Sequence, residues 1–184
     1  LQQIQHSAQQ VAEAIASVLG VEVTIVDDKL KRIAGTGRYD RAVGERLDQA
    51  SAFAQVLRSG RGFVIKEPGK HAACEICRLR DDCAELAEVC CPINVRGSTV
   101  GIIALVAFSD AQRQTLLAQE HDLLDFITRM AELLASKISE QETVQQLQAT
   151  KQQLETVMNS VQEGILAVDR LGRVVNLNTA AATM

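Results

Sequence analysis

The sequence predicts an α+β fold, in which an antiparallel sheet is flanked by helices and followed by a long dimeric signalling helix. Short segments of alternating apolar and polar residues, bounded by turns, are typical of strands in such a sheet. Segments with apolar residues at helical spacing lie before and between these strands. Residues 111–161 contain neither glycine nor proline, which favours one long helix after the sheet.

The first elements expected are a helix and a β-hairpin. Apolar residues recur at helical spacing within residues 1–19, and Gly20 follows them as a stop signal. Residues 21–26 read VEVTIV, which alternates as a strand does. A turn at Asp27 and Asp28 then returns the chain as a second strand over residues 30–34.

The middle of the chain completes the predicted sheet. Apolar residues within residues 41–57 again fit helical spacing, and a short strand is expected over residues 62–65. A loop containing Pro68 and Gly69 leads into a cysteine-rich segment. After the cysteines, residues 93–95 and 99–108 are predicted to form a hairpin around a tight turn.

Composition limits the classes of function. The chain is 47% hydrophobic but only 3% aromatic, which predicts a core of aliphatic side chains. Its net charge of -4 argues against direct nucleic-acid contact by this segment. The longest apolar run, residues 100–108, has the length of a strand and is too short to cross a membrane. We therefore expect no membrane contact and a cytoplasmic location, for a piece excised from a longer protein that begins at Leu1.

The most specific chemical feature is a cluster that holds all five cysteines of the chain: Cys74, Cys77, Cys83, Cys90 and Cys91. The CxxC spacing of the first pair lets both sulfurs turn toward one centre. Cys83 adds a third thiol, and Cys90 or Cys91 would complete the four thiolates of a metal or iron–sulfur site. His71, just before the cluster, is an alternative ligand.

The spacing of the cysteines indicates which metal centre is favoured. Four thiolates around zinc usually come as two CxxC pairs, and only one pair is present. A CxxC followed five residues later by a third cysteine is similar to the cluster motif of the FNR-type transcription regulators. The pair Cys91–Pro92 resembles the last ligand of bacterial ferredoxins. This favours a [4Fe-4S] cluster, with zinc as the alternative. An odd number of cysteines without a secretory segment argues against structural disulfides.

Two longer segments carry a family resemblance. VEVTIVDDKLKRIAGTGRY and CCPINVRGSTVGIIALVAF resemble the GAF/PAS-type sensory domain of bacterial sigma-54-dependent transcription activators. The resemblance implies a GAF/PAS-like domain over residues 1–110, with the cysteine cluster over residues 74–91. It also implies an ATPase and DNA-binding output domain elsewhere in the full chain. GAF domains often hold small ligands against the sheet, so a sensed ligand would lie near Phe63, Ile103 and Leu105 if the cysteines only held structural zinc.

The long helix, residues 111–160, carries apolar residues that trace an approximate alternating spacing of three and four from Leu123 to Val161. Such a narrow seam is typical of a coiled coil. Residues 116–134 also suit a helix packed on its own domain. From Ile138 onward the segment is too polar to be stable as an isolated helix, so a parallel homodimer is expected.

The last segment, residues 161–184, resembles the opening of a PAS domain. A helix leads to GILAVD, then to a turn at Asp169 and Gly172, and then to the returning strand RVVNLN. Arg173 and Asn176 or Asn178 complete the match to the PAS pattern. Only its first hairpin is present.

These features predict signalling and not catalysis. No nucleophile–base set and no phosphate-binding glycine loop is found in the sequence. The expected function is the sensory module of a transcriptional regulator, which senses oxygen, redox state or a small ligand through the cluster and acts on an output domain through the dimeric helix. The alternatives are structural zinc in a small-molecule sensor and a metal-free thiol switch at Cys90–Cys91 or the CxxC. The carboxylates of residues 81–88 are expected on a solvated helix face.

Overall fold

The computed structural model describes residues 1 and 4–183, and these form two compact units. The first unit comprises Leu1–Ser139 and the second comprises Glu140–Met184. Residues 2 and 3, which the sequence places in the first helix, lie outside the described residues.

The first unit contains a five-stranded antiparallel sheet with the strand order β2-β1-β5-β4-β3. The strands are β1 (Glu22–Asp27), β2 (Arg32–Gly35), β3 (Phe63–Ile65), β4 (Ala87–Val95) and β5 (Ser98–Ala107). The helices of this unit are α1 (Gln5–Leu19), α2 (Ala52–Ser59), α3 (Asp110–Ala118) and the first part of α4 (Glu120–Ser160). Two short 3-10 helices are η2 (Gly37–Ala42) and η3 (Ala72–Cys74). The predicted α+β fold with an antiparallel sheet is confirmed.

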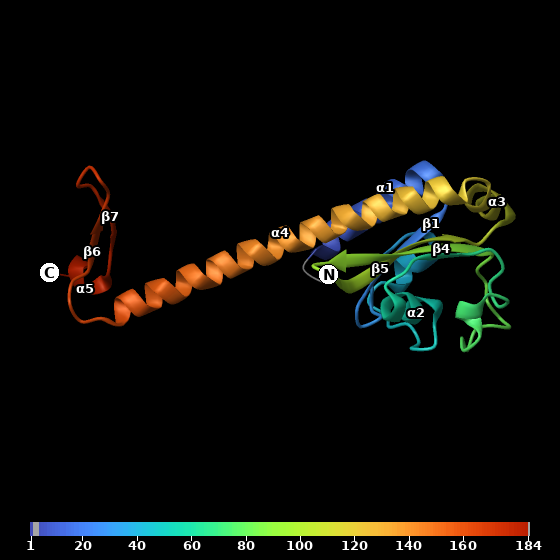
Figure 1. Ribbon diagram of the computed structural model, residues 1–184, viewed down its shortest axis with the longest axis horizontal. Coiled ribbons are helices and arrows are strands. Elements are labelled where there is room, and N and C mark those ends of the chain that lie inside the picture. Colours follow the sequence, from blue (N-terminus) through green and yellow to red (C-terminus); the bar gives the residue numbers. More distant parts are fainter. Residues whose placement is uncertain (2–3, 184) are drawn as a thin grey trace. The chain divides into compact units, whose positions relative to one another are not determined.

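Helices cover both faces of this sheet (Figure 1). Helix α1 and the first part of α4 pack on one face, where Ile15, Ile103 and Ile127 belong to the same apolar core. Helix α2 packs on the other face, where Phe53 and Ile102 belong to a second core. Because successive side chains of a strand point to opposite faces, β4 and β5 contribute alternate residues to the two cores. The β4 side chains that face α2 are therefore separated by the strand from those that face α1 and α4.

The helix predicted over residues 41–57 is shorter than expected. Residues 43–51 instead run beside β2, where the backbone N–H of Arg32 donates to the carbonyl of Glu45 at 2.9 Å. Gly44 has a φ of 96°, a left-handed conformation that ends helical geometry. Ser51 then caps α2 by accepting a hydrogen bond from the backbone N–H of Ala54. Because of the glycine at position 44 and the cap at Ser51, the helix begins later than the apolar spacing predicts.

The helical interpretation of residues 82–89 was also wrong. The chain is irregular up to Leu86, and β4 begins at Ala87. Within β4, Cys90 pairs with Ala104 of β5 and Phe63 of β3, and Cys91 pairs with Ile103. Both cysteines therefore lie inside a paired strand, which begins earlier than the strand predicted over residues 93–95. Because β4 is paired with β3 and β5, its residues cannot leave the sheet without breaking backbone hydrogen bonds.

The predicted long helix is interrupted once. Gln119 has a φ of -132° and a ψ of 38°, which separates α3 from α4. Within α4, Leu123, Ile127 and Leu134 are buried on the sheet of the first unit. Farther along, α4 exposes the large apolar side chains Val144, Leu147, Leu154 and Val157. Among the described residues, no helix is both long and apolar enough to cross a membrane.

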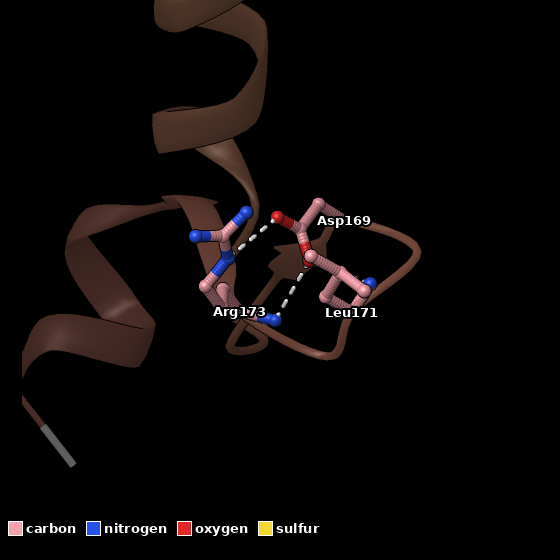
Figure 2. Close-up of polar contacts among 3 residues, drawn as sticks. All are labelled: Asp169, Leu171 and Arg173. Carbon is pink, nitrogen blue, oxygen red and sulfur yellow. Dashed lines mark hydrogen bonds and ion pairs between the residues drawn. The ribbon is translucent and has the colours of Figure 1, made fainter.

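The second unit contains the predicted C-terminal hairpin, formed by β6 (Leu166–Val168) and β7 (Val174–Leu177). Helix α5 (Thr179–Ala182) follows it. In the turn, Asp169 accepts hydrogen bonds from the backbone N–H groups of Leu171 and Arg173 and pairs with the Arg173 side chain at 3.0 Å (Figure 2). Asn178 is buried and donates its side-chain amide toward the carbonyls that end α4, among them Met158.

Candidate effector pocket

A pocket of about 470 Å³ lies on the same side of the sheet as α2. Its walls come from β2, η2, the start of α2, the cysteine-rich segment and the start of β4. The polar and sulfur-bearing residues that line it are Arg32, Tyr39, Arg46, Asp48, Ser51, Cys74, Cys77, Arg78, Cys83, Glu85 and Glu88. Apolar residues, among them Phe53 and Ile65, complete the lining. Three of the five predicted metal ligands thus share one pocket.

The three cysteines reach the pocket through an irregular segment. Cys74 ends η3, and the backbone N–H of Cys77 donates to the carbonyl of Cys74 at 3.1 Å. This turn places the two thiols of the CxxC in the same pocket wall. Burial raises the pKa of Cys74 and raises the pKa of Cys83 to about 11, with the nearby Glu85 charge acting in the same direction. Both thiols are therefore protonated near neutral pH when nothing is bound.

Two carboxylates contribute to the same wall. Glu85 accepts a hydrogen bond from the Tyr39 hydroxyl on Oε1, and its Oε2 lies 4.0 Å from Cys83 Sγ. Glu88, the second residue of β4, is 2% exposed. Burial and the charge of Glu85 raise the pKa of Glu88 to about 8, and burial raises the pKa of Glu85. Of the carboxylates expected on a solvated helix face, Glu85 and Glu88 are thus part of the pocket, whereas Asp81 and Asp82 are exposed and do not line it.

Arg32 supplies positive charge beside these carboxylates. Its Nε donates to Thr24 Oγ1 at 2.8 Å, and its guanidinium lies 4.2 Å from the centre of the Tyr39 ring. Burial lowers the pKa of Arg32, while the Glu85 charge opposes this shift. Arginine remains charged at any physiological pH. The pocket therefore combines a fixed cation with two carboxyl groups whose protonation is sensitive to what binds.

Cys90 and Cys91 are placed differently from the other three. Cys90 is fully buried behind the pocket wall, and its Sγ donates to Glu88 Oε1 at 2.8 Å. Cys91 faces α4 on the opposite side of the sheet, with its Sγ 3.4 Å from Thr128 Oγ1. There it lines a second cavity of about 460 Å³, together with Thr128 and Glu132. The structure therefore does not bring the predicted fourth ligands to the pocket.

The predicted alternative ligand, His71, also lies elsewhere. Its Nδ1 accepts a hydrogen bond from the backbone N–H of Ala73 at 3.1 Å, and its ring stacks on Phe63 with centroids 5.4 Å apart. His71 lines a shallow surface pocket together with Lys66 and Lys70 and not the cysteine pocket.

A comparison with known protein families identifies the family of the first unit. The family model of the GAF domain matches residues 3–138. The chain belongs to the GAF domain family. The match covers the sheet, the cysteine-rich segment and the part of α4 that packs on the sheet, so the pocket lies within the GAF domain.

A curated relative extends beyond this domain. It is a protein of Escherichia coli K12 that is provisionally named as a uric acid sigma-54-dependent transcriptional regulator, UacR. The sequences are 30% identical over an alignment of 186 positions, and this alignment covers 98% of this chain and 30% of that protein. The chain thus spans less than a third of the length of this relative.

Solved structures support the fold of the GAF domain. A GAF domain of the nlh2 protein from A. aeolicus, in an inactive state, has a TM-score of 0.57 at 18% identity and covers 74% of this chain and 85% of that one. Part of a methyl-accepting chemotaxis protein has a TM-score of 0.59 at 20% identity, over 76% of this chain and 90% of that one. The free methionine-R-sulfoxide reductase of Thermoplasma acidophilum has a TM-score of 0.57 at 12% identity. The match covers 76% of this chain and 95% of that one.

The predicted small-ligand residues are not gathered at one site of the GAF domain. Ile103 and Leu105 are fully buried on the face of the sheet that α1 and α4 cover. Phe63 is half-buried beside His71, at the edge of the other face. The alternation of β5 explains this correction, since Ile103 and Leu105 share one face and Ile102 and Ala104 the other.

The sequence interpretation missed four residues of the pocket: Arg32, Tyr39, Glu85 and Glu88. A signal was present for Glu88, because it stands between the apolar residues Ala87 and Val89 of a strand, and a buried charged residue in a strand needs a partner or a function. No pattern in the sequence brings Tyr39 to Glu85, since they are far apart in the chain.

The pocket contains thiols and carboxyl groups, which can bind metals, but these side chains do not surround a metal-binding position. In the part of the chain that is described, no group of three or more His, Cys, Asp or Glu side chains is arranged to hold a metal ion. Apart from η3, the segment between β3 and β4 has no regular structure.

Proposed function

We propose that this GAF domain is the sensory module of a sigma-54-dependent transcriptional regulator, and that its pocket holds a [4Fe-4S] cluster on Cys74, Cys77 and Cys83. The observation that carries the proposal is the shared pocket of these three thiols, which the spacing in the sequence had already grouped. The Escherichia coli relative supports the regulator assignment, and the GAF family supports a sensory role over an enzymatic one.

The residues of the pocket suit the charge of such a group. Metal binding releases the protons of the thiols, because only thiolates ligate iron or zinc. The raised pKa values of Cys74 and Cys83 make this release costly in the empty pocket, and bound cations reverse that cost. Arg32 adds positive charge beside an anionic centre. When bound, the cluster would supply sensitivity to oxygen and to redox state.

Strand β4 supplies a route from the pocket to the signalling helix. Glu88 faces the pocket, whereas Cys91, three residues later, contacts Thr128 of α4. A movement of the pocket wall therefore reaches α4 through one strand. The apolar residues that α4 exposes farther along, Leu147 and Leu154 among them, support a parallel homodimer through this helix. The output domain, an ATPase with a DNA-binding module by family resemblance, would respond to that helix.

The metal-free alternative fits the geometry less well. Cys90 and Cys91 project to opposite faces of the sheet, so the two thiols are not oriented to form a disulfide without distortion of β4. The thiolate is the attacking form in disulfide exchange, and burial raises the pKa of both Cys74 and Cys83. A structural zinc ion on the same three cysteines stays an alternative that metal analysis separates from the cluster.

A second candidate function is favoured by Arg32. The Escherichia coli relative carries uric acid in its name, and urate is a planar anion that a guanidinium can bind through paired hydrogen bonds. The pocket offers Arg32 together with carboxyl groups that can donate or accept hydrogen bonds. Calorimetric titration with urate tests this candidate: binding that the Arg32→Met substitution abolishes would support it, and no binding to the unsubstituted protein would exclude it.

Purification without oxygen tests the cluster directly. The proposal predicts a brown protein with a broad visible band, which contains iron and acid-labile sulfide in equal amounts and bleaches in air. Colourless protein with one zinc per chain would support the structural-zinc alternative. Colourless protein without metal would contradict both.

A further inference from the structure

From the burial pattern of α4 we infer that the dimer seam begins inside the GAF domain, at Phe126, and continues in one heptad register to Met158. The seam is the strip of α4 side chains that meets a second, parallel copy of this chain. The inference rests on the homodimer of the proposed function and deepens it by naming the face in contact. It does not depend on what the pocket holds.

The first part of α4 carries two apolar faces. Leu123, Ile127 and Leu134 are buried in the core against the sheet. Leu133 is 61% exposed, and Phe126 is half-buried. Because successive residues of a helix are about 100° apart, Phe126 and Leu133 lie about a quarter of a turn away from the buried face. The sheet thus covers one face of the helix and leaves the neighbouring apolar face partly exposed.

This second face continues in one register along the rest of the helix, since α4 is a single helix from Glu120 to Ser160. From Phe126 onward, spacings of four and three residues alternate without a break up to Met158. That alternation is the heptad period of a left-handed coiled coil. A seam that begins at Leu123 follows the buried face and needs two successive spacings of three around Val144 to reach the same exposed residues.

The residue types of the seam specify the occupant as a second copy. Leu133, Leu147 and Leu154 occupy heptad position d, and Val144 occupies position a. Leucine at d together with a β-branched residue at a favours two parallel strands. Lys151 also occupies position a, and a polar residue there fixes the register of a coiled coil at a cost in stability.

Two charged positions interrupt the apolar seam. Lys137 and Glu140 occupy consecutive core positions, a and d, between Leu133 and Val144. Their charges are opposite, so each copy brings a balanced pair into this part of the seam. Charged side chains in a core still cost stability relative to apolar ones. The seam is therefore weakest where α4 passes from the first unit to the second, at Ser139.

A dimer on this face leaves the effector pocket open. The pocket lies on the side of the sheet that α2 covers, whereas α4 packs on the other side. The second cavity is also clear of the seam, because Thr128, which lines it, lies on the opposite flank of α4 from Phe126. A ligand can therefore enter either cavity while two copies are associated.

Two neighbouring substitutions in the full 184-residue chain decide the register, with the dissociation constant of the dimer measured by analytical ultracentrifugation. Glu140→Leu is expected to tighten association about 10-fold, because an apolar side chain replaces a charge in the core of both copies. Gln141→Leu is the matched control, since it lies outside the core in this register, and it should change association far less. Tighter association in Gln141→Leu than in Glu140→Leu would overturn the register and favour the seam that begins at Leu123.

Leu133→Glu tests whether the seam enters the GAF domain. A charge at this position is expected to weaken association about 10-fold or more, while hydrogen exchange in the sheet stays unchanged because Leu133 is exposed in the single chain. Ala149→Glu places the same charge on an exposed residue outside the seam and is the control. Equal association of these two variants overturns the extension into the domain. If Leu133→Glu does not fold, the pair at positions 140 and 141 decides.

Leu154→Cys tests the parallel orientation. Mild oxidation should join two copies covalently, because position d of one copy meets position d of the other in a parallel pair. The unsubstituted chain controls for the native thiols, and a dimer that Leu154→Cys does not link would overturn the parallel arrangement. A monomeric unsubstituted chain overturns the inference together with the homodimer, whereas iron and sulfide content tests the proposed cluster separately.

Discussion

Cys90 and Cys91 are adjacent in the chain, yet their thiols lie on opposite faces of β4. Cys90 joins the core beneath α2 and contacts Glu88, whereas Cys91 joins the core beneath α4 and contacts Thr128. The strand thus divides the cysteine cluster of the sequence into a pocket group of three and two separate residues. The same strand connects the pocket wall with the helix that leaves the domain.

The buried carboxyl of Glu88 predicts a pH dependence of stability. Its pKa rises from an ordinary value of 4.5 to about 8 in the folded chain, mainly through burial. The folded state therefore binds more protons than the unfolded state between these values, so the free energy of unfolding falls as the pH rises from about 5 to 8. Denaturant titrations of the metal-free, reduced protein should show a loss of a few kcal/mol across this window.

The matched variant is Glu88→Gln, which keeps the shape of the side chain and removes its titration. The difference in unfolding free energy between Glu88→Gln and the unsubstituted chain should grow in favour of the variant as the pH rises. Parallel stability curves for the two proteins would show that Glu88 is not buried in its neutral form.

Tyr39→Phe removes the hydrogen bond to Glu85 while keeping the ring that lies beneath Arg32. We expect a loss of about 1 kcal/mol in unfolding free energy, because a half-buried carboxyl loses its donor. We also expect faster loss of metal from the loaded protein, since the pocket wall beside Cys83 loses this hydrogen bond. Chelator competition followed in the visible spectrum measures this rate, and an unchanged rate would remove Tyr39 from the site.

The two halves of α4 should respond differently to truncation. Ile127 is fully buried on the sheet, so Ile127→Ala is expected to cost about 2–5 kcal/mol of stability in the GAF domain. Leu147 is 70% exposed, so Leu147→Ala should leave hydrogen exchange in the sheet unchanged. In the proposed dimer, Leu147→Ala should instead weaken association, which analytical ultracentrifugation measures. A chain that is monomeric without substitution would contradict the dimer.

Asn178 is predicted to hold the C-terminal hairpin to the end of α4. Its side chain accepts hydrogen bonds from the N–H groups of Ile165 and Ala181 and donates to three carbonyls, those of Met158, Val161 and Glu163. Asn178→Ala leaves these groups without their partner, which costs about 1–3 kcal/mol for each that stays buried.

Hydrogen exchange of the β6–β7 amides measures this effect, and Asn176→Ala is the matched control. Asn176 lies on the exposed strand β7 and should tolerate the change. Equal protection in the two variants would show that Asn178 does not hold the hairpin.

The sequence predicted those strands and helices that are indicated by the pattern of apolar and polar residues along a short stretch of the chain. The hairpin of β1 and β2 followed from the alternation of residues 21–26 and the turn after it, and helical spacing placed Leu123 and Ile127 on one face of a helix. The helix expected over residues 41–57 failed because apolar spacing does not report the left-handed backbone at Gly44. The break at Gln119 has no glycine or proline to mark it, so the sequence could not indicate it.

The site was predictable in part for the same reason. The turn of the CxxC is local, so the grouping of Cys74 with Cys77 could be read from spacing. The partners on other elements could not, because Tyr39 reaches Glu85 only after the sheet has formed. Cys90 and Cys91 were misplaced because AELAEV fits a helix as well as the start of a strand, and only pairing with β5 decides between them.

Anomalous X-ray diffraction at the iron edge, from crystals grown without oxygen, measures the central claim most directly. The account predicts iron in the pocket, enclosed by the sulfurs of Cys74, Cys77 and Cys83. Iron beside Cys91 and Thr128, or a pocket that contains an organic molecule and no metal, would contradict it.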